Sequence, residues 1–130
     1  MKKNPVVHFE MPYKDAKRVS KFYSAAFGWG MSDAGPDMGH YVVAQTTETD
    51  KNRMVKTPGT INGGFYLLKK ASPEPSVVIS VDDLKKSMAG VKKAGGKILG
   101  KAQDIPGIGL WVSFRDTEGN RVSMLQSSGR

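Results

Sequence analysis

The feature of the sequence that most restricts its fold is an internal repeat, because two segments 68 residues apart share one pattern. Residues 6–29 begin with a strand-like run and pass Asp15 before a helical pattern, and residues 76–97 do the same with Asp83. Aspartate is a common helix N-cap, and glycine commonly ends a helix. The glycines expected to end the two helices are Gly28 and Gly96. An offset near half of the chain length predicts two copies of one supersecondary unit.

Three strand-like pieces follow each predicted helix, so that each half is expected to be β-α-β-β-β. They cover residues 29–33, 40–46 and 61–69 in the first half, and 97–103, 108–114 and 120–126 in the second. DTEGN, residues 116–120, predicts a hairpin turn. The polar residues 47–60 predict a long mobile loop, and PEP at 73–75 predicts a stiff connection. We therefore expect one α+β domain over residues 1–130, with modules over about 5–70 and 75–126.

Helical spacing identifies the face of each helix that packs on the core. In the first helix these residues are Ala16, Val19, Tyr23 and Ala26, flanked by Phe22 and Phe27. In the second helix they are Leu84, Met88 and Val91. The polar side of the second helix carries Lys85, Lys86, Lys92 and Lys93. This spacing is typical of a solvated helix face.

Composition restricts the class of protein further. The 130 residues are 38% hydrophobic and 25% charged, as expected for one globular domain with its own core. No apolar run approaches the length of a membrane helix, and none follows the N-terminal lysines as a signal peptide would, so we expect no membrane partner and a cytoplasmic protein. The chain has no cysteine, which excludes disulfides and thiolate metal sites. The net charge of +8 is compatible with nucleic acid, but no aromatic residues interleave with the helix lysines, so no nucleic-acid partner is expected.

Three stretches make the sequence resemble the vicinal oxygen chelate superfamily of glyoxalase I, bleomycin-resistance proteins and extradiol dioxygenases. They are HFEMPYKDAKRVSKFYSAAFGW, VVISVDD and AGGKILGKAQDIPGIGLWVSFRDTEGN. The PGIG…DTEGN segment is typical of small glyoxalase-like proteins. The resemblance implies that two βαβββ modules form a cupped, half-open barrel, commonly as a homodimer, and that metal-dependent members bind a divalent ion in the cup through His and Glu.

Four positions of the sequence correspond to the metal ligands of the family. His8, seven residues before Asp15, matches the first ligand, and the equivalent position in the second module is Ser76. The closing-strand glutamate of the family falls on Ser123, and the strand GGFYLL of the first half holds no Asp, Glu or His. A catalytic divalent metal normally needs about three protein ligands. We therefore expect no metal and no cofactor, and His8 is interpreted as the remnant of a ligand position.

Strand alternation predicts which side chains line the cup. If His8 faces it, so does Glu10, and Arg121 should share a face with Ser123 on the last strand. The predicted ligand-binding residues are His8, Glu10, Ser76, Arg121 and Ser123. A structural interpretation stays open, with His8 as a hydrogen-bonded strand histidine and Glu10 and Arg121 as an ion pair. His40 and the two tryptophans, Trp29 and Trp111, are expected to be packing or surface residues.

Two functional hypotheses follow from these residues. The first is a metal-free protein that binds a small polar molecule in the cup, assembled as a homodimer. The alternative is an enzyme of the lyase, isomerase or dioxygenase type, with a non-standard divalent metal site or with His8 and Glu10 as acid and base. A shared fold does not fix an activity, so the sequence does not assign catalytic residues.

Overall fold

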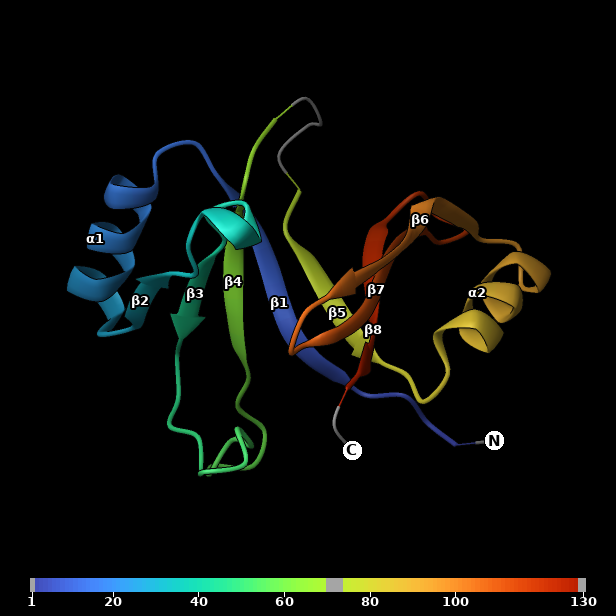
Figure 1. Ribbon diagram of the computed structural model, residues 1–130, viewed down its shortest axis with the longest axis horizontal. Helices are drawn as coiled ribbons and strands as arrows, with labels where there is room; N and C mark the ends of the chain where they lie inside the picture. Colours follow the sequence, from blue (N-terminus) through green and yellow to red (C-terminus); the bar gives the residue numbers. More distant parts are fainter. Residues whose placement is uncertain (1, 70–73, 129–130) are drawn as a thin grey trace. The chain divides into compact units, whose positions relative to one another are not determined.

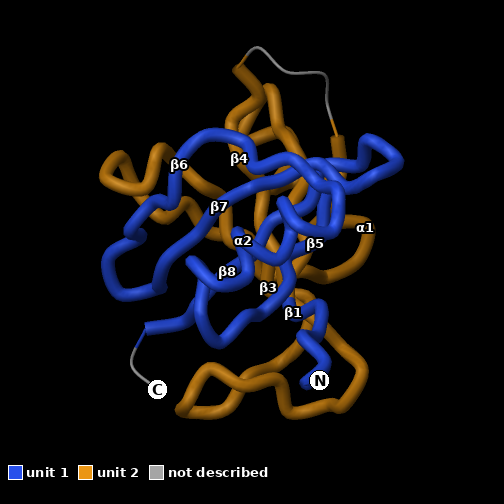
Figure 2. Tube along the Cα trace, turned by 90° about the vertical axis from the view of Figure 1, so that its right-hand side faces the viewer, with its two compact units in different colours: residues 1–7, 76–130 blue, residues 8–75 orange. Residues whose placement is uncertain are grey.

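The computed structural model describes residues 2–69 and 74–128 of the chain (Figure 1). Contacts divide the chain into two compact units, which Figure 2 shows in different colours. Unit 1 joins the N-terminal residues up to Val7 to the chain from Ser76 onward, and unit 2 is His8–Pro75. The boundary falls inside the first strand, so the first residues of that strand belong to the unit built by the second half of the sequence.

Unit 2 contains a four-stranded sheet with one α-helix. Its elements are β1 (Val6–Tyr13), α1 (Ala16–Phe27), β2 (Gly30–Asp33), the 3-10 helix η1 (Pro36–Met38), β3 (Val42–Gln45) and β4 (Asn62–Leu67). The strand order is β2-β3-β4-β1, and β1 runs parallel to β4 while the other pairs are antiparallel. The helix lies on one side of the sheet (Figure 1).

Unit 1 repeats this plan. Its elements are β5 (Ser76–Ser80), α2 (Leu84–Lys93), β6 (Lys97–Ile105), β7 (Gly109–Arg115) and β8 (Arg121–Ser127). The strand order is β5-β8-β7-β6, again with the first strand parallel to the last and the other pairs antiparallel. The predicted β-α-β-β-β repeat is therefore confirmed in both halves of this α+β protein.

Both helices begin at the predicted aspartates. Asp15 accepts a hydrogen bond from the Arg18 backbone N–H at 3.0 Å, and Asp83 accepts one from Lys86 at 3.1 Å. The first helix ends at Gly28, which has the left-handed conformation. The glycine predicted to end the second helix is wrong by one residue, because Gly95, and not Gly96, has a positive φ of 104°. Gly96 is instead required by close packing, since a Cβ there would lie 2.7 Å from the Val91 side chain.

Each helix packs on its own sheet through its predicted apolar residues, except Ala26 of α1, which is exposed. Val19 and Tyr23 of α1 contact a core of unit 2 that includes Phe65, and Met88 and Val91 of α2 contact the core of unit 1 around Leu84. Phe9 and Met11 of β1 also face the unit 2 core. A Cβ at Gly63 would collide with the Phe9 ring, so this glycine lets the ring lie against β4.

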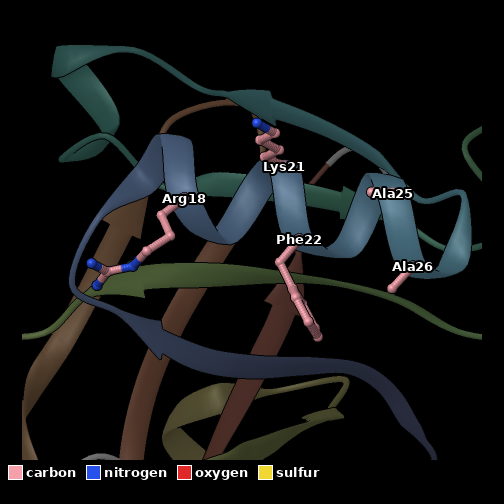
Figure 3. A pocket seen from close by; sticks show the side chains of 5 residues that line it. All are labelled: Arg18, Lys21, Phe22, Ala25 and Ala26. Atoms are coloured by element: carbon pink, nitrogen blue, oxygen red, sulfur yellow. The ribbon is translucent and has the colours of Figure 1, made fainter.

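The outer faces of the two helices differ. In α2 the four lysines are exposed, as predicted. In α1 the exposed side carries Phe22 and Phe27, whose side chains are 57% and 63% exposed. Figure 3 shows the shallow hollow on this helix, which is lined by Arg18, Lys21, Phe22, Ala25 and Ala26. The two phenylalanines thus flank the packed face without being covered.

The connections follow the sequence in part. DTEGN forms the turn between β7 and β8, where Asp116 accepts hydrogen bonds from the backbone of Glu118 and Asn120. The predicted long loop contains an isolated bridge between Thr49 and Val55. Pro73, the first residue of the PEP connection, lies outside the described residues. In the described parts of the chain, neither helix is long and apolar enough to cross a membrane.

Candidate functional site

The most distinctive polar group of unit 2 is a hydrogen-bonded row of three side chains. The Tyr41 hydroxyl donates to Glu10 Oε2 at 3.0 Å, and it lies 2.9 Å from Nε2 of His8. Glu10 is only 9% exposed. The structure therefore brings the two predicted site residues of β1 together through a third residue, Tyr41, which joins them.

Strand alternation explains why His8 and Glu10 share one side of the sheet. They stand two residues apart on β1, while Phe9, between them, packs on the core at the opposite side. The parallel register with β4 places Asn62 beside His8 and Gly64 beside Glu10. The site is thus on the face of the unit 2 sheet opposite to the one that α1 covers.

Gly64 makes room for the tyrosine. A Cβ at this position would collide with the Tyr41 ring, so the ring lies directly against the backbone of β4. Tyr41 itself follows η1, and its backbone carbonyl accepts a hydrogen bond from the N–H of Ala34 at 2.8 Å. A residue outside the strands is in this way held over the strand that contains Gly64, within reach of β1.

Burial determines the electrostatics of the row. It lowers the pKa of His8 from 6.5 to about 4, so the imidazole is neutral at pH 7. It also raises the pKa of Tyr41, and the charge of Glu10 and the hydrogen bond to it act in the same direction. At neutral pH the row therefore contains a neutral imidazole and a neutral phenol beside a carboxyl group.

The predicted serines of unit 1 have a different environment. Ser123 is fully buried, and its hydroxyl lies 3.0 Å from that of Ser113 on β7, which is 3% exposed. The Ser76 hydroxyl donates to the backbone carbonyl of Arg121 at 3.1 Å. The three predicted residues of unit 1 are thus neighbours at the start of β5 and β8, but the serine hydroxyls are used within the sheet. Their role in ligand binding, like that of Arg121, stays a prediction.

His40, expected to be a surface or packing residue, lies on the surface. It precedes β3 and does not belong to the strand, with a positive φ of 57°. Its Nδ1 lies 3.1 Å from Asp33 Oδ2, and its side chain is 57% exposed. Trp29 stacks on Tyr23 at a ring-centroid distance of 4.7 Å and contacts the unit 2 core, as expected for a packing residue.

The donor atoms at the family's metal-ligand positions differ from those that a divalent ion needs. Ser123 and Ser76 offer neutral hydroxyls that are already hydrogen-bonded, and Nε2 of His8 is beside the Tyr41 hydroxyl. Within residues 2–69 and 74–128, no three His, Asp or Glu side chains are grouped so that they could bind a metal ion. The residues at these positions do not fit a divalent ion bound in the manner of the family.

Tyr41 is the residue that the sequence analysis missed. The sequence predicts that it belongs to a strand beginning at residue 40, whereas β3 begins at Val42. A signal was present in the Gly63-Gly64 pair of the neighbouring strand, because glycine inside a strand often marks the close approach of another group. That signal indicates a contact but does not say which side chain makes it.

Comparisons with known proteins agree with this architecture. The family model described as "Glyoxalase/Bleomycin resistance protein/Dioxygenase superfamily" matches residues 6–124. A glyoxylase-like domain-containing protein of Didymella fabae is 32% identical over 126 residues, which cover 93% of this chain and 92% of the relative. A lactoylglutathione lyase of Oryza sativa subsp. japonica is 28% identical over 95% of this chain, but the match spans only 45% of that longer protein.

Among solved structures, methylmalonyl-CoA epimerase from Mycobacterium tuberculosis matches with a TM-score of 0.68 at 12% identity, over 95% of this chain and 88% of that chain. Such a likeness concerns the fold alone. The fold defines the class of protein as one of paired βαβββ modules. The extent of the family match makes the assignment firm: the chain belongs to the glyoxalase/bleomycin resistance protein/dioxygenase superfamily, also called the vicinal oxygen chelate superfamily.

Proposed function

We propose that the protein binds a small polar molecule without a metal ion, on the face of the unit 2 sheet that carries His8 and Glu10. The observation behind this proposal is the buried row of His8, Tyr41 and Glu10. Burying a carboxyl group and an imidazole costs free energy even when they are hydrogen-bonded. A sheet face that retains both offers a ligand directional contacts that an apolar face lacks.

The donor atoms support a metal-free mode of binding. Only the His8 imidazole is an ordinary metal ligand, because the hydroxyls of Ser76 and Ser123 are neutral and already hydrogen-bonded. A catalytic metal needs roughly three ligands. Elemental analysis of the purified protein is expected to find no stoichiometric divalent metal. One Ni, Zn, Fe or Mn per chain that is lost in His8→Ala would contradict the proposal.

Catalysis of proton transfer is a second candidate function. A neutral imidazole and a carboxyl group joined by one hydroxyl are suited to acid-base chemistry, in which His8 would exchange a proton with the ligand. A structural neighbour is an epimerase and a curated relative is a lyase. This candidate predicts that His8→Gln retains ligand binding and loses turnover, whereas the binding protein shows no turnover to lose.

The binding proposal is tested by a thermal-shift screen of carboxylate-bearing and amphoteric metabolites after dialysis against chelator. The wild type, Glu10→Gln and Arg121→Ala are compared. Hits are expected to stabilise the wild type more than Glu10→Gln. If Arg121 contributes, as the sequence predicts, Arg121→Ala weakens binding by roughly 1.5–3 kcal/mol, the scale of hydrogen bonds to charged groups. Equal stabilisation of the wild type and Glu10→Gln by every hit would contradict a site on this face.

We also propose that the protein is a homodimer located in the cytoplasm. Relatives that the sequence resembles commonly form homodimers, and open sheet edges favour association. We expect a dimer mass by light scattering at micromolar concentration, in a protein located in the cytoplasm that binds neither nucleic acid nor membranes. A monomer mass at that concentration would contradict the dimer.

A further inference from the structure

We propose that Tyr41 is a positioning residue that keeps the proton of neutral His8 on Nε2, so that Nδ1 is presented as a hydrogen-bond acceptor. The tyrosine hydroxyl has one hydrogen, which it donates to Glu10 Oε2. Its oxygen can then only accept from the imidazole 2.9 Å away. A neutral imidazole carries one N–H, so Nδ1 of His8 is left with its lone pair.

The direction of the row depends on the glycine beneath the ring. Because a Cβ at Gly64 would collide with Tyr41, the ring occupies one position against β4. The register places Glu10 directly beside Gly64 on the neighbouring strand. The tyrosine hydroxyl is therefore held where it donates to the Glu10 carboxyl group and accepts from the His8 imidazole.

Nδ1 of His8 is not fully enclosed by the protein. Among the residues that the structure describes, it has no hydrogen-bond partner, and no buried side-chain nitrogen or oxygen there lacks one. The atom is therefore reached by solvent. A molecule bound at the proposed site would meet an acceptor, so the ligand is one that donates a hydrogen bond through a hydroxyl or amino group.

The second histidine of the chain provides an internal reference. His40 has Nδ1, and not Nε2, directed at an acceptor, since Nδ1 lies 3.1 Å from Asp33 Oδ2. The sequence contains only these two histidines. The neutral forms of the two rings are expected to be opposite tautomers, which one spectrum of the whole protein can distinguish.

The test is nitrogen-15 NMR of the imidazole rings of the full chain at pH 7, without ligand. In the wild type we expect His8 to show a protonated Nε2 and a bare Nδ1, with a slowly exchanging Nε2–H. Tyr41→Phe removes the hydroxyl, and Gly64→Ala moves the ring but keeps the hydroxyl. In both variants the two tautomers of His8 should be populated, and exchange of the imidazole N–H with water should accelerate at least tenfold. Tyr66→Phe is the matched control, because it removes the hydroxyl that donates to the Glu74 carbonyl and should leave His8 unchanged.

The wild-type spectrum decides the proposal even if a variant fails to fold. A proton on Nδ1 of His8, or equal shares of the two tautomers, would overturn it. So would a Tyr41→Phe spectrum identical to that of the wild type. Only the statement about the ligand rests on the proposed function. Because no ligand is present in the measurement, absence of metabolite binding would contradict the proposed function and leave the role of Tyr41 standing.

Discussion

The two units use the same strand plan but fill one equivalent position in opposite ways. In unit 2 the first strand pairs Glu10 with Gly64 of the last strand, and in unit 1 the first strand pairs Val78 with Ser123. At the glycine, the sheet face is open and receives the Tyr41 ring. At the serine, the side chain is fully buried and meets the hydroxyl of Ser113.

This difference indicates where a row of ionisable side chains can form in a duplicated fold. A glycine on the last strand leaves space for a group from outside the sheet, which connects two ionisable side chains. A serine at the equivalent position satisfies its own hydrogen bond with its neighbour and leaves nothing to titrate. The architecture is repeated, whereas the row of ionisable side chains joined by a tyrosine hydroxyl is found in unit 2.

Restoring the carboxylate that the family has at Ser123 should produce the largest effect. Ser123→Glu places a charge in a fully buried position beside Ser113. We expect a loss of about 3–5 kcal/mol in the free energy of unfolding, the scale of an uncompensated buried charge. Urea unfolding followed by circular dichroism measures it.

Ser123→Ala is the control, because it removes the hydroxyl without adding charge. The cost should be about 1–3 kcal/mol, since Ser113 loses its partner. A Ser123→Glu variant that is as stable as the wild type and takes up one divalent ion per chain would contradict this difference between the units. It would show that unit 1 retains a usable ligand position.

A smaller effect is expected in the response to acid, to which the buried His8 of unit 2 contributes. The folded pKa of His8 is about 4 and its ordinary value is 6.5. Between these values the unfolded chain binds more protons, so the free energy of unfolding falls as the pH falls from about 6.5 to about 4. The loss from His8 should be at most about 3.5 kcal/mol, from about 1.4 kcal/mol per pKa unit.

Carboxyl groups also titrate in this range, so the informative quantity is the difference between wild type and His8→Gln. The glutamine can still donate to Tyr41 but does not gain a proton. We expect the variant to be the more acid-resistant protein, with the difference growing below pH 6.5. A constant difference between pH 4 and pH 7 would show that His8 is not buried in the way described.

The repeat explains why the fold was predictable and the site only partly so. The aspartates, the helix faces and the DTEGN turn are local signals, and they appear in the expected places except for Ala26, which is exposed. His8 and Glu10 were found because two residues of one strand share a face. Tyr41 was missed because its contact depends on Gly64, a residue 23 positions away, and on where β3 begins. The pairing of Ser113 with Ser123 likewise needs the register between two strands.

The smallest effect concerns what the units share. Asp15 and Asp83 cap their helices in the same geometry, at 3.0 and 3.1 Å from the third backbone N–H. Asp15→Ala and Asp83→Ala should each cost about 1 kcal/mol, the usual value of an N-cap. Asn at either position retains the acceptor oxygen, so Asp15→Asn and Asp83→Asn should recover most of that loss. If the two helices are equivalent parts of one repeat, the two alanine variants should agree within about 0.5 kcal/mol, the margin within which separate sites usually add. The free energy of unfolding is measured with urea at pH 7. A full loss of stability at one aspartate and none at the other would show that the units differ in their helix capping as well as in their hydrogen-bonding groups.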